Sequence, residues 1–189
     1  MGLKKQNLNQ KQQYTSVAVY LHWILALLLF VQLYLGLVMV EIPKGPESDR
    51  AFWFNLHKSF GIIIAIFIVF RVLWRLKHNP PPYPHSMKRW QIIVSKFNHF
   101  LLYCCMLVMP ITGIIGSIFS KYPIIFFGYV LPKIADHNAT VKELTSTIHE
   151  YFALLFIFLI TIHIFAALKH LIMDCDQVFE RMMFKINKD

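Results

Sequence analysis

The chain has 189 residues, of which 57% are hydrophobic, 15% aromatic and 15% charged, and its formal net charge is +9. This composition, with a mean hydropathy of +0.51, excludes an ordinary soluble domain. The basic charge by itself is typical of nucleic-acid binding, but the placement of the charges follows the topology rule of membrane proteins, so we expect no nucleic-acid partner.

Four apolar blocks are each long enough to cross a bilayer as an α-helix, which needs roughly 20 predominantly apolar residues. They cover residues 17–40, 54–76, 97–119 and 148–172. We therefore expect an all-α membrane protein, a four-transmembrane-helix bundle that forms a single domain over residues 1–189.

The segments between the blocks have the composition of connectors. Proline and glycine at residues 43–46 break the chain after the first block, and the proline-rich residues 80–84 predict an extended loop. Residues 120–147 form a longer loop that is apolar around residues 124–127, which we expect to lie in the interface or over one end of the bundle. The segment after Asp174 predicts a short basic amphipathic tail helix, with Val178, Phe179, Met182 and Met183 on its apolar side.

The charges orient this bundle. Four spans place the two termini and the 77–96 segment on one side, together with 13 of the 19 basic residues and four of the ten acidic residues. That side then carries the whole net charge of +9. Because lysine and arginine gather on the cytoplasmic side of membrane proteins, we expect both termini to be cytoplasmic.

Six histidines fall within the four apolar blocks, where an ionisable side chain needs a partner or a cofactor, and four of them are the main candidates. His22 lies near the inner end of its span, and His57 and His149 lie near the outer ends of theirs. His163 follows His149 by 14 residues, which is about 21 Å along a helix and close to four full turns. Depth therefore pairs His57 with His149 near the outer face and His22 with His163 near the inner face.

Each pair offers two axial imidazoles from opposing helices to a heme iron, which leaves no open position for a substrate. We therefore predict two non-covalent hemes b and an electron path across the membrane. The sequence contains no C-x-x-C-H motif, which excludes the usual covalent attachment of a c-type heme. Two alternatives are zinc, which usually takes three or four close ligands, and a non-redox transporter or structural protein with structural histidines.

Other residues near the two levels are weaker candidates. Arg71 and Arg75 lie one turn apart at the inner end of the second span, where they anchor heme propionates or extend to the interface. Small residues at Gly61, Gly113 and Gly116 permit close helix approach or make room for a flat macrocycle.

Two further histidines lie near the inner end. His170 follows His163 by seven residues, so it is an alternative iron ligand, a propionate contact or a water-facing side chain. His99 lies one turn before Tyr103 and makes either a core hydrogen bond or a contact to a quinone or a proton relay.

Taken in order along the chain, these residues resemble the bacterial cytochrome b561 family, whose members are four-helix di-heme cytochromes of the inner membrane. The matching stretches are Leu21–Trp23, His57–Gly61, Arg71–Arg75, His99–Tyr103, Met109–Gly113, His149–Glu150, His163, Ala166–His170 and Asp174–Asp176. The resemblance implies two hemes b on the four histidines and a quinone-linked electron carrier. The family is also similar to the cytochrome b subunits that anchor hydrogenases and other dehydrogenases, which leaves a membrane-anchor role as an alternative.

One branch of the family oxidises superoxide at the outer face and reduces ubiquinone, which implies an oxidoreductase. For such a donor we expect Lys58, beside the outer ligand His57, to attract the anion together with Lys121, Lys133 or Lys142. The inner quinone pocket is expected around His99, Tyr103 and His170.

Overall fold

The computed structural model describes residues 13–84 and 86–184. Its main elements are four long helices: α2 (Ser16–Glu41), α3 (Arg50–Lys77), α4 (Arg89–Ile118) and α5 (Ala139–Lys169). A short hairpin of β1 (Ile125–Phe126) and β2 (Tyr129–Val130) lies between α4 and α5. All four helices are long and apolar enough to cross a membrane, so the predicted four spans are confirmed.

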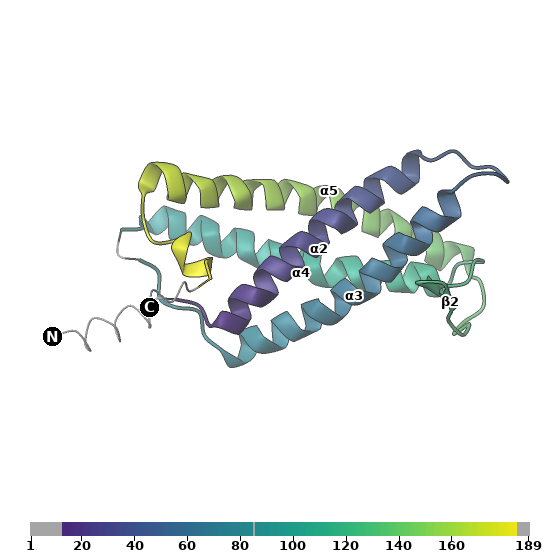
Figure 1. The fold of residues 1–189 in the computed structure, drawn as a ribbon, viewed down its shortest axis with the longest axis horizontal. Coiled ribbons are helices and arrows are strands. Elements are labelled where there is room, and N and C mark those ends of the chain that lie inside the picture. Colours follow the sequence, from purple (N-terminus) through teal and green to yellow (C-terminus); the bar gives the residue numbers. More distant parts are fainter. Residues whose placement is uncertain (1–12, 85, 185–189) are drawn as a thin grey trace.

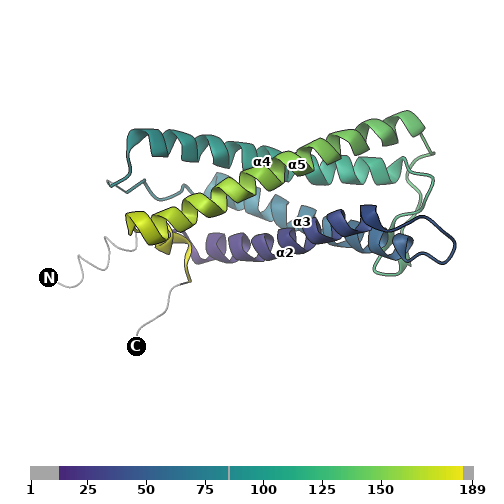
Figure 2. The same cartoon turned by 90° about the horizontal axis from the view of Figure 1, so that it is seen from above.

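The helices form a bundle in which neighbours in sequence pack together (Figure 1). The main contacts join α2 to α3 and α4 to α5, and α3 also contacts α4. Figure 2 shows α5 running obliquely to α2 and α3, which brings its two ends near different helices. The start of α2 and the last described residues lie at one end of the bundle, and the hairpin lies at the other (Figure 1).

The helices extend beyond the apolar blocks because polar residues begin them. α4 starts eight residues before its block, and the backbone N–H of Lys88 donates to the Gln91 side chain at 2.8 Å. α5 starts nine residues before its block, where the Asn138 side chain accepts from the Val141 N–H at 3.1 Å. Hydropathy cannot reveal such a polar first turn, whereas an N-cap side chain stabilises it.

Two kinds of apolar surface organise the bundle. Large side chains such as Leu27, Phe70 and Phe158 point outward and are 55% or more exposed, as expected of helices that face lipid. Seven buried residues from all four helices form the core at the middle of the bundle: Leu25, Ile64, Ile68, Cys105, Met106, Phe156 and Leu159.

The segment after α5 differs from the predicted amphipathic helix. It forms a π-helical turn, η1 (His170–Asp174), then a loop and a 3-10 turn, η2 (Glu180–Met182). Cys175, with φ of 46°, ends the π-helix, and the Asp176 carboxylate accepts from the Val178 N–H at 3.0 Å. These local bonds turn the chain back under the bundle, where a straight helix would continue away from it. Of the predicted apolar side, Val178, Phe179 and Met182 are half-buried and Met183 is exposed.

The tail is attached by polar contacts to the end of the bundle where α2 starts. The Trp23 indole N–H donates to the Met182 carbonyl at 2.7 Å, and the buried Arg181 guanidinium donates to the Pro82 carbonyl at 2.5 Å. Burial raises the pKa of the nearby Tyr14 phenol, against the opposing charges of Arg75 and Arg181. The first span, the 80–84 loop and the tail therefore meet at one place.

Candidate functional site

Two pairs of histidines lie inside the bundle, at two different heights. At the level near the start of α2, called the inner level, His22 of α2 faces His163 of α5, with ring centroids 6.1 Å apart and planes at 63°. The level near the hairpin is called the outer level. At the outer level His57 of α3 faces His149 of α5, with centroids 6.3 Å apart and planes at 78°. All four side chains are half-buried. The structure therefore brings together the two pairs that depth along the helices predicts, and α5 contributes one histidine to each.

These separations can be compared with what a bridging metal needs. Two metal–imidazole bonds of about 2.0 Å each, plus about 1.2 Å from each nitrogen to its ring centre, separate two coaxial rings by about 6.4 Å. Both observed separations lie close to this value, so the two pairs have room for one iron atom between their rings.

Glycines lie behind both outer rings. A Cβ atom added at Gly36 of α2 would lie 3.2 Å from Cε1 of His57, and one added at Gly113 of α4 would lie 3.2 Å from Cε1 of His149. Each outer imidazole therefore packs against the bare backbone of the neighbouring helix. A Cβ atom at either position would push the imidazole by a few tenths of an ångström, so the two glycines set how close each ring lies to the neighbouring helix.

Two polar side chains hold the outer histidines. The Gln32 amide of α2 donates to the His57 carbonyl at 3.1 Å and lies 3.1 Å from Nε2 of the same residue. Thr112 of α4 lies 3.0 Å from Nδ1 of His149. In the described part of the chain, Nδ1 of His57 and the Gln32 oxygen are buried without a hydrogen-bond partner. The outer level therefore contains polar atoms whose bonding within the chain is incomplete.

The inner pair has a cationic and aromatic surrounding. Nη2 of Arg71 lies 3.3 Å from Nδ1 of His22, and its guanidinium lies over the Tyr103 ring at 5.9 Å. The ring of His99 packs edge-on against His163 with centroids 5.2 Å apart, and its Nδ1 donates to the Ser95 carbonyl at 2.7 Å. This separation is shorter than a bridging iron requires, so His22 is the better partner for His163.

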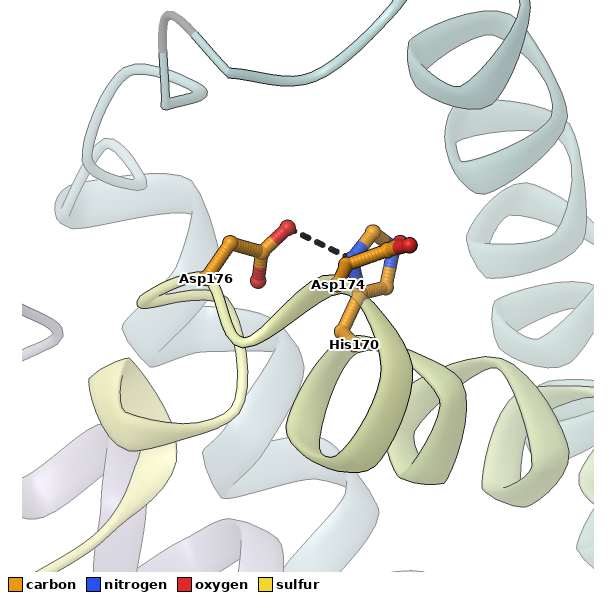
Figure 3. Close-up of side chains that lie close together, drawn as sticks. All are labelled: His170, Asp174 and Asp176. Atoms are coloured by element: carbon orange, nitrogen blue, oxygen red, sulfur yellow. Dashed lines mark hydrogen bonds and ion pairs between the residues drawn. The ribbon is translucent and has the colours of Figure 1, made fainter.

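His170 lies in a separate group of charged side chains at the end of α5 (Figure 3). It is buried, and its Nδ1 lies 2.7 Å from the Asp176 carboxylate and 3.2 Å from that of Asp174. Lys169 also pairs with Asp174, at 2.5 Å. The carboxylates thus already have cationic or N–H partners, and the group fastens the π-helical turn to the tail.

The outer end near Lys58 is covered in part by the hairpin. Ser59, which is 1% exposed, accepts from the Phe127 N–H at 3.0 Å and lies 3.2 Å from the Ile125 carbonyl. Phe127 adopts a positive φ of 44° and packs its ring 5.6 Å from that of Phe60. The loop expected over the end of the bundle is therefore an ordered hairpin fixed to α3 beside the outer histidine.

The four candidate lysines have different surroundings. Lys58 is half-buried, and Lys142 of α5 is close enough to act on it electrostatically. Lys133 pairs with Asp136 at 3.0 Å, and Lys121 lies over the Tyr122 ring at 5.2 Å. Lys142 is therefore the candidate lysine that lies near Lys58, and Lys58 is the sequence neighbour of His57.

Sequence reasoning missed Gln32 and Ser59 as parts of the site and gave no role to the Thr112 hydroxyl. A signal was present, because an uncharged polar side chain inside an apolar span is uncommon and usually has a partner. The sequence could not identify that partner, since each of these contacts joins two different helices or a helix and a loop.

Comparison with known proteins identifies the family. A sequence profile described as prokaryotic cytochrome b561 matches residues 13–185. Cytochrome b561 homolog 2 of Escherichia coli (strain K12) is 30% identical over 190 residues, covering 96% of both chains. Cytochrome b561 homolog 1 of the same organism is 28% identical over 173 residues, covering 90% of this chain and 97% of that one.

A third relative, named probable superoxide oxidase CybB, comes from Yersinia pestis. It is 25% identical over 175 residues, which cover 92% of this chain and 97% of the relative. The resemblance inferred from the motifs is thus confirmed over nearly the whole length, and it coincides with four helices of membrane-spanning length. The chain therefore belongs to the prokaryotic cytochrome b561 family and is a multi-pass b-type cytochrome of the inner membrane that takes part in electron transfer.

Proposed function

We propose that the chain binds two hemes b, one between His22 and His163 and one between His57 and His149, and carries electrons between them. Membership of a b-type cytochrome family supports heme as the cofactor. The observation that carries the proposal is the pair of facing imidazoles at each of two heights, 6.1 and 6.3 Å apart. One pair would be an ordinary structural contact, whereas two pairs sharing α5 suit two cofactors of the same kind.

The side chains of the site would position the heme and exclude small ligands from its iron, and the bound heme supplies one-electron chemistry. Each histidine pair, His22 with His163 and His57 with His149, would hold one heme iron from two opposing helices and would so keep small ligands from it. The Gln32 amide lies 3.1 Å from both Nε2 and the carbonyl of His57, so it would keep its bond to the carbonyl if Nε2 were given up to the iron. The 14 residues between His149 and His163 separate the two levels by about 21 Å, which spans most of a hydrocarbon core.

The orientation follows the charges. We propose that the end with the α2 start and the tail faces the cytoplasm, together with both termini, because this end carries the excess of lysine and arginine. The hairpin, Lys58 and the outer histidine pair then face the opposite side of the membrane.

Superoxide is the proposed donor at the outer side. The Yersinia pestis relative is named a probable superoxide oxidase. Lys58 and Lys142 give the outer level of this chain a cationic neighbour for a small anion. Each superoxide gives up one electron and becomes dioxygen, so no proton is needed at this side.

A quinone is the proposed acceptor at the inner side. Two electrons from the outer donor and two protons from the cytoplasmic water convert one quinone, such as ubiquinone, to its quinol. His99 and Tyr103 are the preferred contacts, because His99 packs against His163 and Tyr103 lies beneath Arg71. His170 is the weaker choice, since two carboxylates already engage its ring.

Visible spectroscopy tests the heme proposal. Purified protein should show a b-type α-band in the reduced-minus-oxidised spectrum and two hemes per chain by pyridine haemochrome. His22→Ala should remove one heme and His149→Ala the other. His137→Ala is the control, because His137 lies in the outer loop and bonds the Phe119 carbonyl at 2.8 Å. A wild-type protein without the α-band, or variants as loaded as the control, would disprove the assignment.

Superoxide kinetics test the role of Lys58. Replacing it with glutamate should slow oxidation by about tenfold or more at low salt and weaken the salt dependence, because steering by charge is screened by ions. Lys44→Glu is the matched control, since it makes the same charge change in the exposed loop after α2. If Lys58→Glu oxidised superoxide at the wild-type rate, and this rate did not depend on salt, the result would count against an anionic donor near Lys58.

A further inference from the structure

Thr112 makes the contact on which this inference rests. It lies in α4, is 8% exposed, and its hydroxyl reaches across to α5, where Oγ1 lies 3.0 Å from Nδ1 of His149. The same hydroxyl donates within its own helix, to the Val108 carbonyl at 2.8 Å with the Met109 carbonyl at 3.1 Å. Its single hydrogen is therefore committed to the backbone of α4.

This commitment decides where the proton of His149 lies. A hydroxyl whose hydrogen is used elsewhere can only accept, so Nδ1 of His149 must carry the hydrogen and donate it to Oγ1. In a neutral imidazole with hydrogen on Nδ1, the lone pair lies on Nε2, which is the form that a metal binds.

We propose that Thr112 is a positioning residue of the outer heme site, which holds the ring of His149 in the orientation and tautomer that present Nε2 to the iron. This inference rests on the proposed function, because it takes His149 to be an iron ligand. The opposite ligand differs, since Nδ1 of His57 has no hydrogen-bond partner in the described part of the chain. Thr112 thus makes the two ligands of the outer heme unequal, because a hydroxyl holds Nδ1 of His149 and no group holds Nδ1 of His57 in the described part of the chain.

The chain offers a close control in Thr145. Thr145 is also 8% exposed, and its hydroxyl makes the same pair of bonds inside its own helix, to the Val141 carbonyl at 2.8 Å and the Lys142 carbonyl at 3.1 Å. It lies against Gly116, one turn before His149 in α5, and the hydrogen bonds of its hydroxyl in the described part of the chain go to the backbone and not to a histidine ring. Thr145→Val therefore removes an equally buried hydroxyl from the same helix interface without changing His149.

The experiment uses the full chain with His22→Ala, so that the outer heme is observed alone. Thr112→Val keeps the side-chain volume and removes the acceptor. Heme release to excess apomyoglobin should become about 10- to 100-fold faster, the usual effect of losing the group that orients a metal ligand. The midpoint potential should also rise, because His149 becomes a weaker donor to the iron. Thr112→Ser should restore both values, and Thr145→Val should match the parent.

Two results would overturn the proposal. In the first, Thr112→Val releases heme at the same rate as Thr145→Val and its midpoint potential is unchanged. In the second, Thr112→Ser fails to restore the release rate and the potential. Either result would leave Thr112 with a packing role only. Failure of the proposed function gives a different result, which is seen before Thr112 is changed. In that case His149→Ala, made in the otherwise unmodified chain, would keep the outer heme.

Discussion

Replacing Gly113 with alanine should loosen the outer heme by moving one ligand. The added Cβ would lie 3.2 Å from Cε1 of His149, whereas ordinary contacts of this kind begin at 3.4 Å and extend to 4 Å. The ring must therefore retreat by a few tenths of an ångström. A metal–ligand distance can deviate from its ideal value by only about 0.2 Å, so even the smallest such shift of the His149 ring uses up this range. Overpacking costs about 1–3 kcal/mol, which corresponds to a roughly 5- to 150-fold weaker binding of heme.

The effect should appear in heme binding and not in folding. Alanine is favoured over glycine within a helix by about 0.5–1 kcal/mol, so the protein without heme should be as stable as the wild type or more so. Transfer of heme to excess apomyoglobin, followed at the α-band, measures the rate of heme release. Thermal unfolding of the heme-free protein measures its stability.

Gly116 provides the control for this substitution. A Cβ at Gly116 would lie 2.9 Å from Oγ1 of Thr145, a tighter contact in the same pair of helices that does not involve a histidine. Heme release from Gly113→Ala should exceed release from Gly116→Ala. Equal rates in the two variants would show that helix packing, and not the position of His149, controls the outer site, and the reasoning would be wrong.

Three further outcomes are expected. Ser59→Ala leaves the Phe127 N–H without its acceptor, which costs about 1–3 kcal/mol, so exchange of that amide should accelerate about 5- to 150-fold; unchanged exchange would mean that the hairpin is held by its aromatic contacts. Trp23→Phe removes the bond to the Met182 carbonyl, worth about 0.5–1.5 kcal/mol, and should speed tryptic cleavage of the tail, whereas an equally resistant tail would argue against this attachment. Cys175 is exposed, so a membrane-impermeant maleimide should label it in inverted vesicles and not in spheroplasts; the opposite pattern would reverse the proposed orientation.

The spans and the pairing of the histidines could be predicted because both depend on one-dimensional quantities. Hydropathy over about 20 residues gives a spanning helix, and the rise per residue converts sequence position into depth. His57 meets His149, and His22 meets His163, because each pair lies at one depth within a bundle whose helices are nearly as long as the membrane is thick.

The remaining features depend on contacts that no periodic pattern encodes. Strands of two residues carry no alternation, so the hairpin depends on a bond between Ser59 and a loop 66 to 68 residues later. The polar starts of α4 and α5 are invisible to hydropathy, which placed them eight and nine residues too late. The tail departs from a helix because Asp176 takes the Val178 N–H and the His170 ring, a local competition that its amphipathic pattern does not reveal.

The apolar core also determines how electron transfer through such a protein should respond to the membrane voltage. Phe156 lies seven residues from both His149 and His163, and the other six buried residues of its core have hydrocarbon, thioether or thiol side chains. In the proposed transfer between the two heme levels, an electron would cross this layer without a proton beside it. Its passage therefore separates charge across the bilayer and should respond to the membrane voltage, by up to about 2.3 kcal/mol per 100 mV for a full crossing.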